Sequence, residues 1–189
     1  MPESQAPLDL EKLSLADIAR LVAERRLPPV EQWNPTHCGD SEMRIARDGT
    51  WFHQGSPIGR PAMVRLFSTI LRREPDGRFV LVTPVEKLDI AVDDAPFVAI
   101  GVKSEGEGKA RQLAFQLNTG DAVIADGAHP LRFESREDGP HPYVKVRAGL
   151  DALIARPVYY ELAEIALAEE SDPIGLWSGG SFFPLEPAE

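Results

Sequence analysis

An alternation of apolar and polar residues between residues 78 and 147 constrains the fold of this chain more than any other feature. The repeat is cleanest over 112–117, and it recurs over 87–92 and 98–102. Successive side chains of a strand point to opposite faces of a sheet, so a period of two predicts strands with one buried face. Several such strands in succession predict a strand-rich second part.

The N-terminal part of the sequence predicts two helices around a hairpin. Apolar residues recur at helical spacing over 8–26, and Ser14 begins the Ser-x-x-Asp pattern of a capping box. An Asp-Gly turn favours a hairpin over 42–54, and Pro61 suits the first turn of a second helix. We therefore expect a helix–hairpin–helix unit over residues 1–75.

The C-terminal part of the sequence predicts a long helix followed by an aromatic tail. Apolar residues recur at helical spacing over 150–168, and Pro157 is expected to kink that helix or split it in two. The tail over 174–185 carries three aromatic rings, which we expect to pack back onto the body of the protein. The chain is therefore predicted to be α+β, with its second part over 76–189.

A short pattern repeats between the two parts. Residues 47–49 (Arg-Asp-Gly) precede a strand and then a helix, and residues 137–139 (Glu-Asp-Gly) precede another strand and helix. The repeat fits duplication of a strands-plus-helix unit. Because Asp-Gly pairs are common turn formers, duplication and chance similarity both stay open at this point.

Composition limits the partners and the compartment. The formal net charge of −10 would repel a nucleic-acid polymer, although a local basic patch can still bind a small anion. The single cysteine, Cys38, cannot form an intramolecular disulfide. The start of the chain lacks a signal-peptide pattern, and no window has the ~18–20 apolar residues of a membrane span. We therefore expect a cytoplasmic protein with neither nucleic acid nor membrane as a partner.

Patterns typical of enzymes and cofactor sites are weak in this sequence. The glycine-rich stretch 106–109 lacks the hydroxyl residue and the helix of a phosphate loop, and predicts a hairpin tip. His37, Cys38 and Asp40 have the chemistry of metal ligands or of catalytic groups, in a stretch over 33–40 that reads as a loop. We expect no catalytic residue, no metal and no cofactor, while an enzyme that uses these three groups is an alternative.

The strongest candidate for a binding site is a group of polar residues on the second helix. Arg65 and Arg72, with Ser68 or Thr69 between them, are spaced to lie on one helix face and to donate hydrogen bonds to a phosphate or carboxylate. Ion pairing of the same arginines with acidic neighbours, including Glu86, is the alternative explanation. Both explanations stay open.

Several motifs of this chain together resemble one bacterial family. They are Trp33-Asn34-Pro35, Cys38-Gly39-Asp40, Asp48-Gly49-Thr50-Trp51, Pro57-Ile58, and the runs over 64–73, 81–87, 143–147 and 176–185. In order and spacing they are similar to the family called domain of unknown function 1285. The resemblance covers nearly the whole chain from about residue 30 onward.

The resemblance carries implications for fold and function. It implies a core built by duplication, and a C-terminal part superficially similar to a pleckstrin-homology-like roll closed by a helix. We therefore expect the second part to form an antiparallel roll that the C-terminal helix closes. It implies a small-ligand site at the interface of the two parts, suited to a nucleotide-like molecule, and a role in signal transduction. No enzymatic activity comes with the family.

We therefore predict a non-enzymatic sensor that binds a small anionic or nucleotide-like ligand between its two parts, with a signalling protein as a further partner. Arginines would hold the anion, and a threonine and a lysine after the next strand would add donors. The predicted ligand-binding residues are Arg65, Ser68, Arg72, Thr83, Glu86 and Lys87, with Trp51 or Trp177 as a stacking face. A protein-interaction module without a small ligand is the second alternative.

Overall fold

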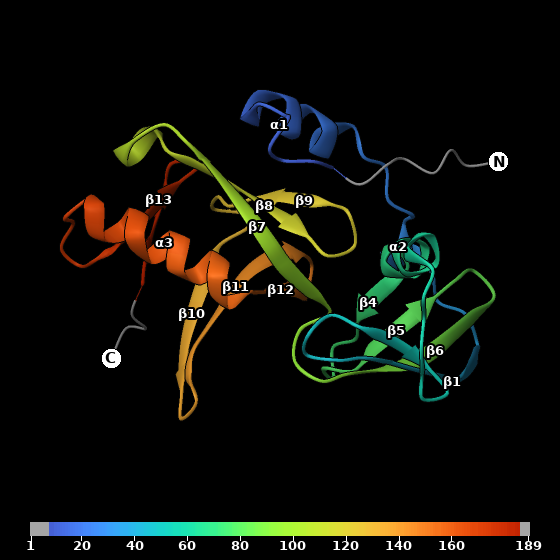
Figure 1. Ribbon diagram of the computed structural model, residues 1–189. Coiled ribbons are helices and arrows are strands. Elements are labelled where there is room, and N and C mark those ends of the chain that lie inside the picture. Colours follow the sequence, from blue (N-terminus) through green and yellow to red (C-terminus); the bar gives the residue numbers. More distant parts are fainter. Residues whose placement is uncertain (1–7, 186–189) are drawn as a thin grey trace.

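The protein folds into two β-rich domains that share one apolar core. In the computed structural model, which describes residues 8–185, two six-stranded sheets are accompanied by three α-helices and a C-terminal hairpin (Figure 1). An α+β protein of two domains is thereby confirmed. No helix within the described residues is long and apolar enough to cross a membrane.

The first sheet belongs to the N-terminal domain. Its strands are β1 (His37–Ile45), β2 (Trp51–His53), β3 (Ser56–Pro57), β4 (Leu71–Arg73), β5 (Phe79–Val82) and β6 (Glu86–Val92). They lie in the order β3-β2-β1-β6-β5-β4, so two antiparallel meanders meet at the central pair of β1 and β6. That pair is the first and last strand of the domain, and it is parallel. Helix α2 (Pro61–Thr69) connects the two meanders.

The second sheet repeats this strand order. Its strands are β7 (Phe97–Glu105), β8 (Gln112–Leu117), β9 (Ala122–Ile124), β10 (Leu131–Arg136), β11 (Gly139–Arg147) and β12 (Leu150–Ile154). They lie in the order β10-β11-β12-β7-β8-β9, and the first and last strands again form a parallel central pair. The predicted antiparallel roll is therefore wrong in this pair, and the sheet is mixed.

The remaining elements flank the sheets. They are α1 (Leu15–Glu24), α3 (Arg156–Ala168), the 3-10 turns η1 (Val30–Gln32) and η2 (Gly108–Ala110), and the hairpin strands β13 (Gly175–Ser178) and β14 (Ser181–Pro184). Helix α1 is shorter than predicted, and the predicted capping box between Ser14 and Asp17 is present. Although α1 precedes the first domain, it lies beside β8 and β9 of the second (Figure 1), where Leu15 and Ile18 pack on Ala114.

A single apolar core runs through both domains. Its largest fully buried side chains come from both sheets, from α3 and from the hairpin: Ile45, Trp51, Leu71, Phe97, Leu113, Phe115, Leu117, Leu150, Ile154, Leu162 and Leu176. Protein interiors are packed to the density of organic crystals. The two domains are therefore joined by apolar packing.

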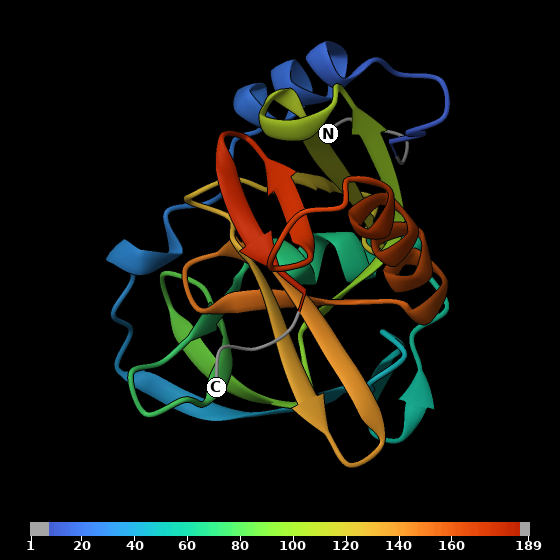
Figure 2. The same cartoon turned by 90° about the vertical axis from the view of Figure 1, so that its left-hand side faces the viewer.

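The C-terminal tail packs back onto the second domain, where its hairpin lies beside α3 (Figure 2). Phe183 is buried in the core with Leu176. Trp177 and Phe182 are half-buried, and their ring centroids lie 5.3 Å apart. The aromatic tail is thus ordered by packing, with one of its three rings buried as predicted and two at the rim.

The predicted helix over 150–168 begins later in the structure. Residues Leu150–Ile154 form β12, which lies between β7 and β11 and buries Leu150, Ala152 and Ile154. A short apolar run fits a strand or a helix equally well. Here pairing with β7 and β11 on either side makes this run a strand. Pro157 stands in the first turn of α3, where its missing N–H costs nothing, so it neither kinks nor splits the helix.

Two further segments differ from prediction for the same reason. Residues 37–40, predicted as loop, extend β1 along β6. Helix α2 ends at Thr69, so Arg72 lies on β4, where it faces Val80 of β5, and not on the helix face with Arg65. Pairing with a neighbouring strand outweighs the local helical pattern, because the strand satisfies backbone groups that would otherwise be buried unpaired.

The sheets divide the chain after β6. Strands β5 and β6, which follow residue 75, hydrogen-bond to β4 and β1 of the first sheet. The linker between the sheets is the short stretch 93–96. The first domain therefore includes these two strands together with β1 to β4 and α2, while α1 packs on the second domain.

Candidate ligand-binding site between the domains

A cavity of about 510 Å³ lies between the two domains. The first domain contributes the β1–β2 turn, Trp51, Ile58 and the first half of α2. The second domain contributes Ile100 and the end of β8 with the turn that follows, residues 116–120. This volume is typical of small-molecule sites, which often form at domain interfaces. The cavity is therefore a candidate binding site of the kind predicted from the sequence.

Two buried polar atoms belong to residues that line this cavity and lack hydrogen-bond partners. Trp51 is 1% exposed and Thr119 is 6% exposed. Within residues 8–185, neither the indole Nε1–H of Trp51 nor the hydroxyl of Thr119 has a partner. A buried polar group without a partner costs ~1–3 kcal/mol, and such groups are few in native proteins. Both groups can donate hydrogen bonds, so a ligand rich in acceptors would satisfy them.

Arg65 lies on α2 and lines the same cavity. Its Nε donates to the carbonyl oxygen of Thr119 at 3.3 Å, and its Nη2 donates to that of Gly120 at 3.3 Å. Gly120 has a φ of +91°, and a Cβ there would lie 2.3 Å from Nη2 of Arg65. Glycine at this position thus lets the guanidinium lie directly against the turn after β8.

Two more arginines gather around this turn, and with Arg65 they form what we call the arginine cluster: Arg25, Arg65 and Arg147. Arg25, at the end of α1, forms an ion pair with Asp121. Arg147, at the end of β11, donates to the carbonyl oxygen of Ser68. Burial, and then the positive charges of Arg147 and Arg65, lower the pKa of Arg25 to about 10. Guanidiniums that disfavour one another's charged form are stabilised by a nearby anion.

One carboxylate, Asp48, also lines the cavity. It belongs to the β1–β2 turn and accepts a hydrogen bond from the backbone N–H of Thr50 at 2.9 Å. That hydrogen bond is the largest cause of the lowered pKa of Asp48, so this group is ionised at neutral pH. The lining thus includes both a guanidinium and a carboxylate, and it can bind acceptors and hydroxyl donors of one molecule.

Three of the predicted site residues meet at or near this cavity. Trp51 and Arg65 line it, and Ser68 lies one turn further along α2, where its hydroxyl donates to the carbonyl oxygen of Arg65 at 2.7 Å. Trp51 stacks on Phe67 with ring centroids 6.5 Å apart, inside the core. Its ring faces are therefore not exposed for ligand stacking, and its polar N–H is the group of interest.

Arg72 and Lys87 lie elsewhere and are joined through Glu74. Arg72 is buried; its Nη1 donates to the carbonyl oxygens of Val30 at 2.7 Å and Trp33 at 2.8 Å, and its Nη2 pairs with Glu74 at 2.7 Å. Lys87 pairs with the same Glu74 oxygen at 3.4 Å. Because these donors already bind protein acceptors, Arg72 fastens the segment around η1 to the first sheet.

The other predicted site residues do not line the cavity. Thr83 shapes the β5–β6 turn, since its hydroxyl accepts hydrogen bonds from the N–H groups of Val85 and Glu86. Trp177 belongs to the C-terminal hairpin, with the ammonium of Lys109 over its ring at 5.4 Å. These residues were predicted to lie at the site, and in the structure they lie away from the cavity.

The groups of the alternative enzyme site are spread along an exposed strand. His37, Cys38 and Asp40 are all exposed on β1. Within the described residues, no three His, Cys, Asp or Glu side chains are grouped to hold a metal ion. One buried histidine, His141, does contact a carboxylate, that of Asp138, at 2.8 Å, but it lines neither this cavity nor the second one described below.

The turn after β8 lines the cavity, although no residue of this turn was predicted to belong to the site. Asn118 accepts a hydrogen bond from the N–H of Val98 at 2.9 Å and donates to the carbonyl oxygen of Gly49 at 3.2 Å, so it ties this turn to the first domain. The available signal was the Asn-Thr-Gly sequence, which is typical of a turn between strands. That signal gives the local structure, and it contains nothing that indicates a ligand.

Comparison with known proteins decides the family. The profile described as domain of unknown function (DUF1285), N-terminal domain, matches residues 28–95, and the profile of the DUF1285 C-terminal domain matches residues 96–185. The chain belongs to the DUF1285 family. The resemblance inferred from the motifs is thereby confirmed, and the junction of the two DUF1285 domains coincides with the linker between the sheets.

Two solved structures of DUF1285 family proteins are similar to this one. The protein from Silicibacter pomeroyi DSS-3 is 52% identical with a TM-score of 0.79, and the match covers 91% of this chain and 94% of that chain. The protein from Shewanella baltica OS155 is 23% identical with a TM-score of 0.51, and the match covers 68% of this chain and 96% of that chain. The second likeness concerns the fold alone. No curated protein matches this DUF1285 chain.

Proposed function

We propose that this protein is a non-enzymatic sensor that binds a small anionic, nucleotide-like ligand in the cavity between its domains. One observation carries the proposal. Three donors belong to residues that line the same cavity, and two of them, on Trp51 and Thr119, are buried without partners within residues 8–185. The third is the guanidinium of Arg65. Such a wall is complementary to a ligand that presents several acceptors.

The anionic character of the ligand is supported by the arginine cluster. The chain has a net charge of −10, yet three guanidiniums meet around the turn that borders the cavity. A nearby charge acts over roughly a Debye length of about 8–10 Å, so the charges that matter there are the three guanidiniums and the two carboxylates of Asp121 and Asp48, which leave a local excess of one positive charge. Arginine suits phosphate and carboxylate groups because its planar fork binds two oxygens at once.

A nucleotide-like shape is supported by the rest of the lining. Asp48 can accept hydrogen bonds from hydroxyl groups, as an acidic residue does with a ribose in dinucleotide-binding folds. Ile58, Val64 and Ile100 also line the cavity and offer apolar surface to a flat ring. A ligand with an anionic end, hydroxyls and an apolar ring fits this set of side chains.

The sensing step uses the fact that both domains form the cavity walls. A ligand that contacts Arg65 of α2 and Thr119 of the second domain together stabilises the arrangement in which these walls are close. A ligand shifts a conformational equilibrium only by its difference in affinity for the two states. We propose that this shift alters the surface offered to a signalling protein in the cytoplasm.

Two features of the fold belong to the same proposal. The identical strand order of the two sheets supports an origin by duplication of one unit. The second sheet with its closing helix α3 is the part that we relate to a pleckstrin-homology-like roll. We place the surface for a signalling partner on this second domain.

A thermal-shift screen of nucleotides and other phosphorylated metabolites tests the proposal. A ligand present at a hundred times its dissociation constant should add about 2.7 kcal/mol of stability. Each hit is then titrated calorimetrically against the wild type and the variants Arg65→Gln and Thr119→Val. Both variants should bind more weakly, by about 1.5–3 kcal/mol for the charged donor and about 0.5–1.5 kcal/mol for the hydroxyl.

Thr119→Val separates a binding role from a structural one. Valine has nearly the shape of threonine, and the lost hydroxyl has no partner in the described protein, so the ligand-free variant should melt at the same temperature or higher. Arg78→Gln is the control, because Arg78 is exposed, pairs with Asp76 and Asp89, and does not line the cavity. Full affinity in both test variants, or no hit in the screen, would contradict the proposal.

A further inference from the structure

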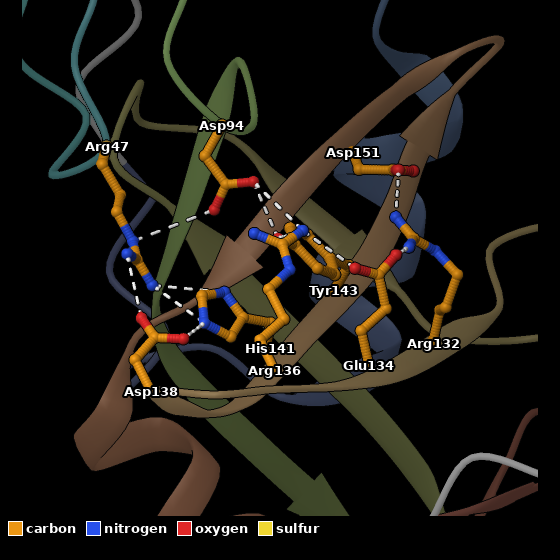
Figure 3. A network of polar contacts seen from close by, with 9 residues as sticks. All are labelled: Arg47, Asp94, Arg132, Glu134, Arg136, Asp138, His141, Tyr143 and Asp151. Atoms are coloured by element: carbon orange, nitrogen blue, oxygen red, sulfur yellow. Dashed lines mark hydrogen bonds and ion pairs between the residues drawn. The ribbon is translucent and has the colours of Figure 1, made fainter.

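A second, strongly polar cavity of about 450 Å³ lies on another part of the seam between the domains. Its walls include the linker residues Asp94–Pro96, Arg73 and Phe79 from the first domain, and one face of β10, β11 and β12. Arg132, Glu134 and Arg136 alternate along β10 and point to this face together with Tyr143 of β11 (Figure 3). None of these residues lines the first cavity.

Asp94 holds a carboxylate oxygen that is buried and lacks a hydrogen bond. Its Oδ1 accepts a hydrogen bond from the Tyr143 hydroxyl at 2.7 Å. Its Oδ2 has no hydrogen-bond donor within residues 8–185, and the nearest cation, Nε of Arg47, lies 3.9 Å away. Arg136 reaches only Oδ1, also at 3.9 Å (Figure 3). Buried carboxylates normally have their oxygens paired, so this oxygen is suited to a donor from outside the protein.

The other charges that face this cavity cancel one another. Arg132 pairs with Glu134 and, at 2.9 Å, with Asp151. Arg136 pairs with Glu134 at 2.8 Å and donates a hydrogen bond to the Tyr143 hydroxyl at 3.0 Å, while its contact with Asp94 is longer, at 3.9 Å. The two arginines thus offset the two carboxylates of Glu134 and Asp151. Asp94 is the acid whose pairing is incomplete.

Arg73 is the arginine of this cavity that has no ion-pair partner among the described residues. It is exposed on β4, and its guanidinium lies over the Phe79 ring at 5.3 Å. Among the described residues it forms no ion pair. A cation–π contact leaves the N–H groups at the edge of the guanidinium able to donate to an anion. The cavity therefore has one incompletely paired acid and one unpaired base in its lining.

We infer that this second cavity binds a small zwitterion, of the chemical class of a free α-amino acid. The ammonium group of the ligand would donate to Oδ2 of Asp94, and its carboxylate would accept from Arg73. Net charge favours a zwitterion over a simple anion or cation, since the six charged residues of the lining sum to zero: three arginines against Asp94, Glu134 and Asp151. The cavity is within the range of volumes of small-ligand sites.

Calorimetric titration of the full chain with the common amino acids tests the inference. At least one should bind at millimolar concentration or below. Its N-acetyl form lacks the ammonium and its amide lacks the carboxylate, so each should bind at least about tenfold more weakly. Absence of binding by every amino acid, or equal binding of the blocked forms, overturns the inference.

Variants then place the ligand in this cavity. Asp94→Asn keeps an acceptor for the Tyr143 hydroxyl and should weaken binding about ten- to hundredfold. Arg73→Gln, at an exposed position that tolerates change, should also weaken binding about ten- to hundredfold. If Asp94→Asn does not fold, Arg73→Gln alone tests whether the ligand binds in this cavity. Arg78→Gln is the control and should bind the amino acid as the wild type does. Unchanged affinity in Arg73→Gln contradicts the inference, whatever the outcome for nucleotides.

Discussion

The two sheets of this protein have the same strand order but receive their helices at different points of the chain. In each sheet two antiparallel meanders meet at a parallel pair made by the first and last strands. In the first, α2 connects the meanders. In the second, residues 125–130 connect them without a helix, and α3 follows the last strand.

This difference places one helix at the cavity between the domains and the other over the core. Helix α2 lies at the seam, where Arg65 lines the cavity between the domains. Helix α3 instead buries Val158, Leu162 and Ala166 and closes the core of the second domain. One sheet topology can therefore hold its helix in either place, and the point where the helix enters the chain decides which domain has a helix at the cavity.

The C-terminal hairpin packs on the second domain, and the first domain has no counterpart of it. Removal of this hairpin should have the largest effect on the stability of the protein. Deletion from residue 174 onward exposes the core surface that Leu176 and Phe183 cover. Full burial of such side chains contributes ~1.5–3 kcal/mol each, so the deletion should lower the free energy of unfolding by about 3–6 kcal/mol. Urea denaturation of both chains measures this, and an unchanged midpoint would show that the hairpin is dispensable.

Two adjacent arginines of the first domain should differ sharply in their effect on stability. Arg72→Ala leaves the carbonyl groups of Val30 and Trp33 without their donor and leaves Glu74 only its longer contact with Lys87, and the loss of one partner of a buried pair costs about 3–5 kcal/mol. Arg73→Ala, at the next and exposed position, should cost less than about 1 kcal/mol. Urea denaturation compares them. Equal losses would mean that Arg72 does not brace the first domain.

The fit of Arg65 against the second domain can be tested with glycine substitutions. Gly120 and Gly55 both have positive φ, at +91° and +79°, so alanine at either position should cost about 1–2 kcal/mol of backbone strain. Only at Gly120 does the new Cβ collide with Arg65, since nothing lies within 4 Å at Gly55. Melting curves should therefore be similar, while calorimetry with a ligand of the first cavity should show weaker binding for Gly120→Ala alone.

The smallest effect concerns Tyr143 of the second domain. Burial, and then the hydrogen bond to Asp94, raise the pKa of Tyr143 from the usual 10 to about 12. A raised pKa keeps the phenol protonated, so its contribution to stability is complete below pH 10 and is lost as the pH rises through about 12. The near-ultraviolet absorbance of phenolate should show a late step that Tyr143→Phe removes and Tyr160→Phe retains.

Local signals in the sequence predicted local structure well. The Ser14 capping box, the hairpin of β1 and β2, the start of α2 at Pro61 and the strand over 112–117 all stand where the patterns indicated. Each depends on contacts between residues close in the chain. Capping, turn chemistry and side-chain periodicity act over a few residues, so a short window contains what is needed to predict them.

The site could be predicted in part. The family motifs led to a site between two domains, and Arg65 and Trp51 do line a cavity there. Arg72 was wrongly placed beside Arg65, because a helical spacing was extended past the residue where α2 ends. Thr119 was missed, since a turn residue shows no sign in sequence of being buried without a partner.

The sequence by itself determined the strand-rich α+β class, the local start of each early element and membership of the family. Only the tertiary structure decided that 150–154 is a strand, that Arg72 braces the first sheet, and that Thr119 and Arg65, 54 residues apart, line one cavity. The reason is physical. Burial and strand pairing depend on neighbours distant in sequence, and these long-range contacts outweigh local propensities of a few tenths of a kcal/mol to ~1 kcal/mol per residue.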